Sequence, residues 1–113
     1  MKLVIAYIRP DRLSHVKQAL FSRKIYNMSV TNVVGAGRGM GYTANYRGVV
    51  TEVNLLKKIR LEIGINDDFL DATIAGLKEG AKTGEKGDGV IFVQDISEAI
   101  RIRTEETGAA AIG

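Results

Sequence analysis

The chain has 113 residues, enough for one domain around a single core, and its 45% hydrophobic and 26% charged residues exclude a disordered or fibrous chain. It contains no cysteine, which excludes disulfides and Cys-based zinc sites, and its net charge of +3 suits a phosphate-bearing small ligand better than a long nucleic acid. No apolar run reaches the roughly 20 residues of a membrane-spanning helix. We therefore expect a cytoplasmic protein that does not insert into a membrane.

The first third of the chain predicts a strand, a helix and a second strand. Residues 2–8 are mostly apolar, and Pro10 with Asp11 then opens a helix. The apolar side of this helix recurs at helical spacing and comprises Leu13, Val16, Ala19 and Leu20. Its solvent side should carry Arg12, His15 and Ser22. Residues 28–34 are rich in β-branched side chains and predict the second strand, which ends where glycines interrupt the pattern.

A long connection follows, from residue 37 to about residue 53, without a clear helical or strand period. Such loops are uncommon in a small domain and are usually functional or mobile. Residues 58–65 then alternate between large apolar residues and charged or small ones, which predicts a strand with one buried face. The next helix is expected to run to Gly80 and to begin at the capping side chains of Asn66, Asp67 and Asp68.

The last third predicts a short apolar strand at residues 90–93. Further on, two isoleucines alternate with Arg101 and Arg103, which predicts an extended stretch with both guanidinium groups on one side. The tail, residues 104–113, consists of small or polar residues and is expected to be mobile.

The order of these elements is that of the α+β ferredoxin-like fold, in which two helices cover one face of a four-stranded antiparallel sheet. We expect one such domain over residues 1–113. Its other face would expose a large apolar patch in so small a protein, so we expect self-association to cover it.

A glycine-rich segment, residues 83–93, has the composition of an anion site. Its glycines let backbone amides approach a phosphate closely, Lys86 can supply charge, and Asp88 can hold a ribose hydroxyl or shape the turn. Taken alone, a plain loop before a strand is an equally good interpretation.

Two segments that contain arginine also indicate an anion site. Arg101 and Arg103 can bind phosphate oxygens bidentately, although two arginines on a solvated face are just as common. Alternating glycines surround Arg38 in the segment 35–41, which favours a pliable loop that approaches an anion, with a simple hinge as the alternative.

Few residues indicate other functions. Glu62 could accept a hydrogen bond from an adenine amino group, although surface carboxylates are common. His15 is the only histidine, and no nucleophile, base or metal set occurs at a recognisable spacing, which makes a small enzyme the weaker alternative. An RNA-binding module is weaker still, because it needs aromatic residues on its central strands and the strand at residues 58–65 has none.

Together these motifs resemble the PII nitrogen-regulatory proteins. The resemblance lies in the segment 83–93, the stretch 101–104, the Gly37-Arg38 start of the long loop and the Tyr46-Arg47-Gly48 sequence within it. It extends without obvious gaps from residue 1 to residue 104. It implies a homotrimer of ferredoxin-like subunits that binds ATP or ADP in the clefts between neighbours. It also implies that the loop at residues 37–53, the T-loop, docks on a client protein.

The resemblance also implies a role for each matching residue. The phosphates and ribose would be held by Gly87, Asp88 and Gly89. Further phosphate contacts would come from Arg101, Arg103 and, at the base of the loop, Gly35, Gly37 and Arg38. The adenine would lie near Tyr7, Ser29 and Glu62. Lys58 occupies the place of the lysine that pairs with a carboxylate of 2-oxoglutarate.

Departures from the family pattern modify this expectation. Val90 stands where the family has a lysine or arginine, which suggests weaker binding or a preference for ADP or AMP unless Lys86 substitutes for the missing cation. Gly39 replaces the glutamine that helps to ligate Mg²⁺ and 2-oxoglutarate. Mg²⁺ binding is therefore left undecided, and 2-oxoglutarate sensing is not expected. Thr51 and Val49 replace residues that other members modify covalently, so we expect regulation by ligand alone.

We therefore expect a regulator without enzymatic activity that controls a partner, either a membrane transporter or an enzyme. An ammonium channel is the client that the resemblance favours, whereas the departures favour a transporter of inorganic carbon or metal ions. Partner contact would fall to loop residues, among them Gly39, Gly41, Tyr46, Arg47 and Thr51.

Overall fold

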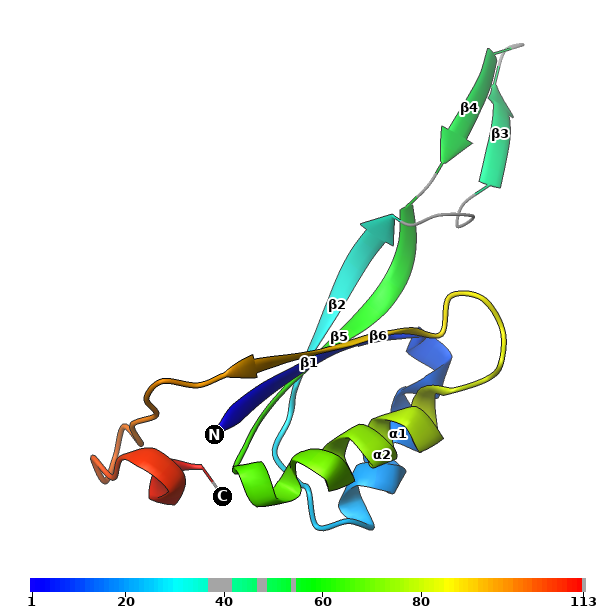
Figure 1. Cartoon of the computed structure of the whole chain (residues 1–113). Coiled ribbons are helices and arrows are strands. Elements are labelled where there is room, and N and C mark those ends of the chain that lie inside the picture. Colours follow the sequence, from blue (N-terminus) through cyan, green and yellow to red (C-terminus); the bar gives the residue numbers. More distant parts are fainter. Residues whose placement is uncertain (37–41, 47–48, 54, 113) are drawn as a thin grey trace.

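The computed structural model describes residues 1–36, 42–46, 49–53 and 55–112. Its main sheet has four antiparallel strands in the order β2-β5-β1-β6, and two helices cover one face of it (Figure 1). The elements of this unit are β1 (Lys2–Ile8), α1 (Leu13–Phe21), β2 (Ser29–Ala36), β5 (Leu55–Ile65), α2 (Leu70–Ala81) and β6 (Gly89–Asp95). The predicted α+β ferredoxin-like fold is confirmed.

The core lies between the sheet and the helices. Alternate residues of β1 and β5 point toward the helices and are buried, and the register that pairs Val4 with Ile63 brings them together. The fully buried side chains include Val4, Ile8, Leu61 and Ile63 from the strands and Val16, Leu20 and Leu77 from the helices. The alternation read from residues 58–65 therefore predicted the buried face correctly.

The two helices approach each other closely at a glycine. A Cβ atom added to Gly80 would lie 2.5 Å from the Cα atom of Val16, so only glycine fits there. Arg12 lies in the 3-10 turn Pro10–Arg12 that precedes α1, and its Nε donates to the carbonyl of Gly80 at 2.8 Å. Arg12 was predicted to face solvent, and this was wrong because the guanidinium bridges the two helices.

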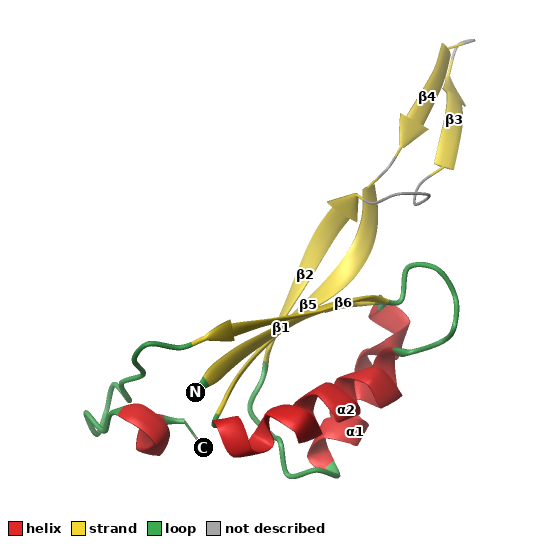
Figure 2. Ribbon diagram, in the orientation of Figure 1, coloured by secondary structure: helices red, strands yellow, loops and turns green. Residues whose placement is uncertain are grey.

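The long connection contains regular structure that its sequence did not indicate. Strands β3 (Tyr42–Tyr46) and β4 (Val49–Val53) pair antiparallel and form a separate two-stranded sheet (Figure 2). The expectation of a loop without secondary structure was therefore wrong. Antiparallel pairing can stabilise a hairpin whose individual strands have no clear hydrophobic alternation.

The face of the sheet opposite the helices is open, and its part along β1 and β6 is apolar. Cross-strand partners share a face, so the pairs Tyr7–Val90 and Ile5–Phe92 lie together on this side. Val90 is 46% exposed and Phe92 is 50% exposed. Tyr7 and Phe92 pack edge to face with their ring centroids 6.3 Å apart. We refer to these four residues as the open-face patch.

The chain end follows a course different from the predicted one. An isolated bridge joins Ile100 to Thr107, and the amide of Arg101 donates to the carbonyl of Glu106 at 2.8 Å. The segment is thus a tight hairpin, and the extended stretch predicted at Arg101 and Arg103 was wrong. A short 3-10 helix, Gly108–Ala111, follows it. The predicted mobility of the tail stays a prediction.

Candidate functional site

Most predicted nucleotide residues that the structure describes gather in one cleft. It lies where the ends of β1 and β2 and the start of β5 meet the loop before β6. Its lining includes the predicted residues Tyr7, Gly35, Lys58, Gly87, Asp88, Gly89 and Val90, together with Ala36, Glu85 and Phe92. We call it the loop cleft. Its glycine-rich rim and aromatic wall can hold a phosphate at one end and a planar ring at the other.

Two other predicted residues lie in a second depression, at the start of β2. Ser29 and Glu62 are directly paired across β2 and β5. They line this depression together with Tyr26, Asn27, Met28 and Gly64. The carboxylate of Glu62 forms an ion pair with Arg60 Nη1 at 2.8 Å. We call this depression the β2 depression.

The two sites lie at different positions along the same strands. Ser29 starts β2, whereas Gly35 and Ala36 end it, and Glu62 follows Lys58 by four residues on β5. At about 3.3 Å per residue, the interval is about 20 Å from Ser29 to Gly35 and about 13 Å from Lys58 to Glu62. Ser29 and Glu62 therefore line a depression of their own, apart from the loop cleft.

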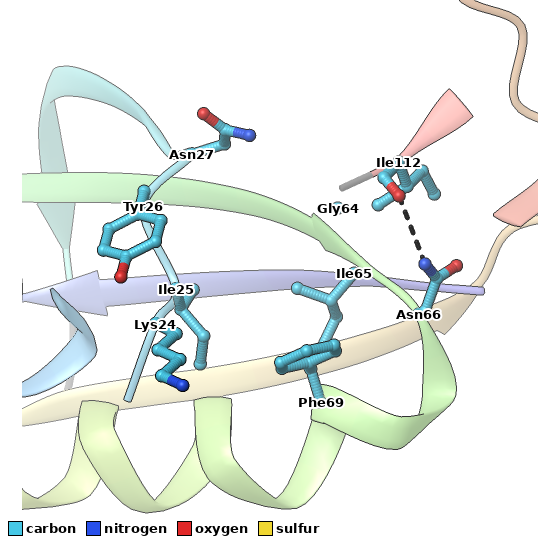
Figure 3. Close-up of a pocket in the computed structure, with 9 residues that line it drawn as sticks. All are labelled: Lys24, Ile25, Tyr26, Asn27, Gly64, Ile65, Asn66, Phe69 and Ile112. Carbon is cyan, nitrogen blue, oxygen red and sulfur yellow. Dashed lines mark hydrogen bonds between the residues drawn. The ribbon is translucent and has the colours of Figure 1, made fainter. Parts of the chain in front are cut away.

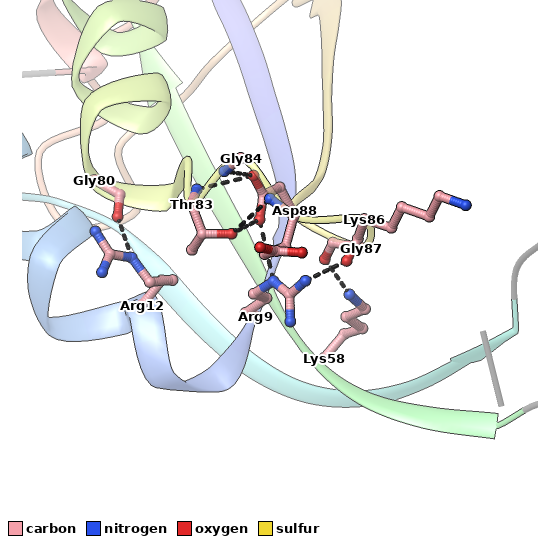
Figure 4. A network of polar contacts seen from close by, with 10 residues as sticks. Arg9, Arg12, Lys58, Gly80, Thr83, Gly84, Lys86, Gly87 and Asp88 are labelled. Carbon is pink, nitrogen blue, oxygen red and sulfur yellow. Dashed lines mark hydrogen bonds and ion pairs between the residues drawn. The ribbon is translucent and has the colours of Figure 1, made fainter. Parts of the chain in front are cut away.

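Asp88 organises the loop that borders the cleft (Figure 4). Its Oδ2 accepts hydrogen bonds from the amides of Thr83 at 2.8 Å and Gly84 at 2.9 Å, and its Oδ1 accepts from the Thr83 hydroxyl and from Arg9 Nε. These bonds, above all those from Thr83, hold the pKa of the Asp88 carboxyl far below its usual range. Both oxygens are already engaged, so Asp88 shapes the turn, which is one of the two roles that the sequence left open.

Arg9 is a residue that the sequence analysis missed. It follows β1 directly, one position beyond Ile8, which pairs with Gly89. This register places Arg9 opposite Asp88, and the guanidinium contacts both the Asp88 carboxylate and the carbonyl of Lys86. An antiparallel pairing of the first and last predicted strands would have placed Arg9 beside Asp88.

Lys58 also contacts the loop. Its Nζ donates to the carbonyl of Gly87 at 2.5 Å. Burial lowers the pKa of Lys58, the positive charge of Arg9 lowers it further, and Asp88 acts in the opposite direction. Lys58 therefore joins Arg9 and Asp88 in one electrostatic cluster at the cleft. Its predicted pairing with 2-oxoglutarate stays a prediction.

Gly89 is required by the backbone itself. Its φ is +111°, and a Cβ atom at this position would lie 1.7 Å from the carbonyl oxygen of Tyr7. The glycine thus allows β6 to start directly against β1. This close approach fixes where the loop ends and the cleft begins.

Three predicted phosphate cations lie away from the loop cleft. Lys86 is exposed, and its side chain extends away from the Asp88 network (Figure 4). Arg101 and Arg103 are exposed on the terminal hairpin and line neither the loop cleft nor the β2 depression. The substitution of Lys86 for the cation missing at Val90 stays a prediction.

Several predicted residues fall outside the described part of the chain. These are Gly37, Arg38, Gly39, Gly41 and Arg47. Tyr46 ends β3 and Thr51 lies in β4. The roles predicted for these residues therefore remain predictions.

An apolar hollow lies between the end of β5 and the chain terminus (Figure 3). Ile65 and Phe69 border it, and Ile112 of the tail lies at its rim. Asn66 donates from Nδ2 to the carbonyls of Ala109 and Ile112, each at 3.2 Å. Its side chain makes no capping bond to the following 3-10 turn, so the predicted cap at Asn66 was wrong. It holds the terminal segment against the sheet instead.

Comparison with known proteins identifies the family. The model of the family "Nitrogen regulatory protein P-II" matches residues 1–106. The chain belongs to the P-II family. It is 47% identical over 114 residues to the nitrogen regulatory protein GlnK1 of Methanosarcina mazei, covering 99% of this chain and 97% of that protein. It is 44% identical over 112 residues to the nitrogen regulatory protein GlnK of Escherichia coli, covering 99% and 100%.

The relatives are named as regulatory proteins, which agrees with the expectation of a regulator. The nitrogen regulatory protein P-II 2 of Methanothermobacter thermautotrophicus is 42% identical over 112 residues, with 99% of this chain and 97% of that protein covered. Among the described residues, no cluster of three or more His, Asp or Glu could hold a metal ion. Within the same part of the chain, no helix has the length and apolar character needed to cross a membrane.

Proposed function

We propose that this P-II protein binds an adenine nucleotide, ATP or ADP with AMP as a further candidate, in clefts between the subunits of a homotrimer. The observation that carries the proposal is the division of the predicted site. Gly35, Lys58 and the loop at residues 87–89 line one depression, whereas Ser29 and Glu62 line another. A nucleotide would contact both groups where the β2 depression of one copy meets the loop cleft of the next. Repeated head to tail, such a contact closes a ring when the rotation between copies is about 120°.

The open-face patch supports association. Its exposed aromatic and aliphatic side chains, among them Val90 and Phe92, lie beside the loop cleft. Burial of apolar surface is the main favourable contribution to most protein association. Copies that meet over this patch would bring the two parts of the site to the same boundary, so assembly and ligand binding would depend on each other.

The bound nucleotide would act on a client through the T-loop. The loop cleft includes Gly35 and Ala36, the last residues of β2, and the T-loop follows them in the chain. A ligand in the cleft is therefore close in sequence to the segment that would meet the client. Ligands that favour different loop arrangements would expose or hide the docking surface.

The client is proposed to be a membrane transporter. An ammonium channel is the first candidate. A transporter of inorganic carbon or metal ions, without 2-oxoglutarate sensing, is the alternative that the departures at Gly39, Thr51 and Val90 favour. Purified protein with each candidate transporter, tested for co-elution with ATP and with ADP, separates the two.

Calorimetry and thermal unfolding test the nucleotide site. ATP, ADP and AMP would each be titrated alone and with 2-oxoglutarate or bicarbonate, because a ligand that binds only the folded protein raises its stability. We expect a stoichiometry near one adenine nucleotide per chain and no effect of 2-oxoglutarate. A protein that ignores all three nucleotides would contradict the proposal.

A further inference from the structure

Arg9 fastens the loop at residues 83–89 to the end of β1 (Figure 4). Its Nε donates to Asp88 Oδ1 at 3.1 Å, and one of its terminal nitrogens donates to the carbonyl of Lys86. The side chains of Arg9 and Asp88 are 31% and 24% exposed, so the pair is partly shielded from water. Arg9 therefore combines a charged contact and a backbone contact within one short loop.

The remaining contacts of Asp88 are local. They come from Thr83 and Gly84, which lie five and four residues away in the same loop. Local bonds can shape a turn but do not fix its position on the sheet. Arg9 supplies that connection from a residue 79 positions away in sequence.

The contact to the Lys86 carbonyl also orients an amide. In a trans peptide the C=O and N–H bonds point in opposite directions. Because Arg9 binds the carbonyl of Lys86, it turns the N–H of Gly87 to the opposite side of the peptide. Lys58 binds the carbonyl of Gly87 in the same way and so turns the N–H of Asp88.

The loop divides its amides into two groups. The amides of Thr83, Gly84 and Glu85 donate to side chains of the loop itself, namely Asp88 and Thr83. The amides of Lys86 and Gly87 have no acceptor among the residues that the structure describes. Gly87 has a φ of +89°. Successive free amides around such a turn form a concave anion site.

We propose that Arg9 is a positioning residue for phosphate binding, acting through the loop without touching the ligand. It anchors Asp88 and directs the Gly87 amide, so the anion site exists before the ligand arrives. A prepared site avoids the ordering cost that a flexible loop pays on binding. The inference rests on the proposed nucleotide function.

The test compares substitutions at Arg9 with the same substitutions at Arg12. Arg12 lies on the next turn and donates its Nε to the carbonyl of Gly80, so it is a matched arginine-to-carbonyl contact outside the loop. The variants are Arg9→Gln, Arg9→Lys, Arg12→Gln and Arg12→Lys. The readouts are hydrogen exchange of the Thr83 and Gly84 amides without ligand, and calorimetric affinity for ATP and ADP.

We expect Arg9→Gln to speed exchange of both loop amides and to weaken nucleotide binding about three- to tenfold, the size of one or two ordinary hydrogen bonds. Arg9→Lys should remain close to Arg9→Gln, because an ammonium group lacks the planar fork that reaches both acceptors. In both Arg12 variants, the exchange rates of the loop amides and the nucleotide affinity should equal those of the unchanged protein.

Three results would overturn the inference. Unchanged exchange in Arg9→Gln would show that Arg9 does not hold the loop. Full recovery of affinity in Arg9→Lys would show that only its charge matters. An equal loss in Arg12→Gln would show a general effect on the fold. If the unchanged protein binds no nucleotide, the proposed function fails, whereas the ligand-free exchange still decides whether Arg9 holds the loop.

Discussion

Replacing Gly89 by alanine should break the junction between β1 and β6. The added Cβ would lie 1.7 Å from the carbonyl oxygen of Tyr7, where no atom fits, so the strands must separate. Such overpacking costs about 1–3 kcal/mol. The φ of +111° adds about 1–2 kcal/mol for a residue with a side chain. The free energy of unfolding should therefore fall by about 2–5 kcal/mol.

Two other glycines separate these contributions. Gly84 has a φ of +89° but nothing within 4 Å of an added Cβ, so Gly84→Ala should cost only the backbone strain, about 1–2 kcal/mol. Gly64 has neither feature, and Gly64→Ala should change stability by less than about 0.5 kcal/mol.

The assay is urea unfolding at one fixed protein concentration, because association contributes to the stability of an oligomer. The expected order of destabilisation is Gly89→Ala, then Gly84→Ala, then Gly64→Ala. Equal effects of the first two substitutions would refute the reasoning, since the clash with Tyr7 would then contribute nothing.

Four further outcomes are expected. Leu61→Ala should lower the free energy of unfolding by about 2–5 kcal/mol, because Leu61 is fully buried, and urea unfolding measures it. Arg103→Ala should cost about 1.5–3 kcal/mol of nucleotide affinity, a loss of about 10- to 150-fold by calorimetry, and an unchanged affinity would remove Arg103 from the site. Phe92→Asp should shift the protein to a smaller species in light scattering, because it places a charge in the open-face patch; an unaltered mass would mean that another surface holds the copies together. The pKa of Asp88 is lowered in the folded protein, so below about pH 4 the unfolded chain binds more protons and the free energy of unfolding falls as the pH falls. Asp88→Asn should flatten this pH dependence of stability. An identical slope in both proteins would count against the Asp88 network.

The sequence predicted the main sheet and its buried face well. The strict alternation at Ile59, Leu61, Ile63 and Ile65 reflects a real division between core and open face, and all four are buried. A periodic pattern of this length determines which face of the strand is buried, because a shift by one residue would expose every apolar side chain.

Shorter patterns were less informative. The alternation around Arg101 and Arg103 spans only four residues, and a strand needs a partner to form. The chain instead folds back on itself between Ile100 and Thr107, where the bridge and the bond from Arg101 to Glu106 close a hairpin. Composition alone does not distinguish these two outcomes.

The sequence indicated residues for the candidate site but not their arrangement. Glycines and Asp88 drew attention to the loop at residues 83–89, since their composition suits an anion. The part played by Arg9 depends on the pairing of β1 with β6, two strands far apart in sequence. The separation of Ser29 and Glu62 from the loop cleft depends on the pairing register of β2 and β5, which a motif does not contain.

The most direct measurement mixes two inactive variants. Asp88→Ala damages the loop cleft and Glu62→Ala damages the β2 depression, and each is first checked by light scattering for the mass of the unchanged protein. Neither variant alone should bind a nucleotide well. If the site spans two copies, oligomers co-refolded from equal amounts of the two should regain binding in about a quarter of their clefts, where an intact half of each kind meets. If mixing restores no binding at all, the nucleotide does not bridge two chains and the account is wrong.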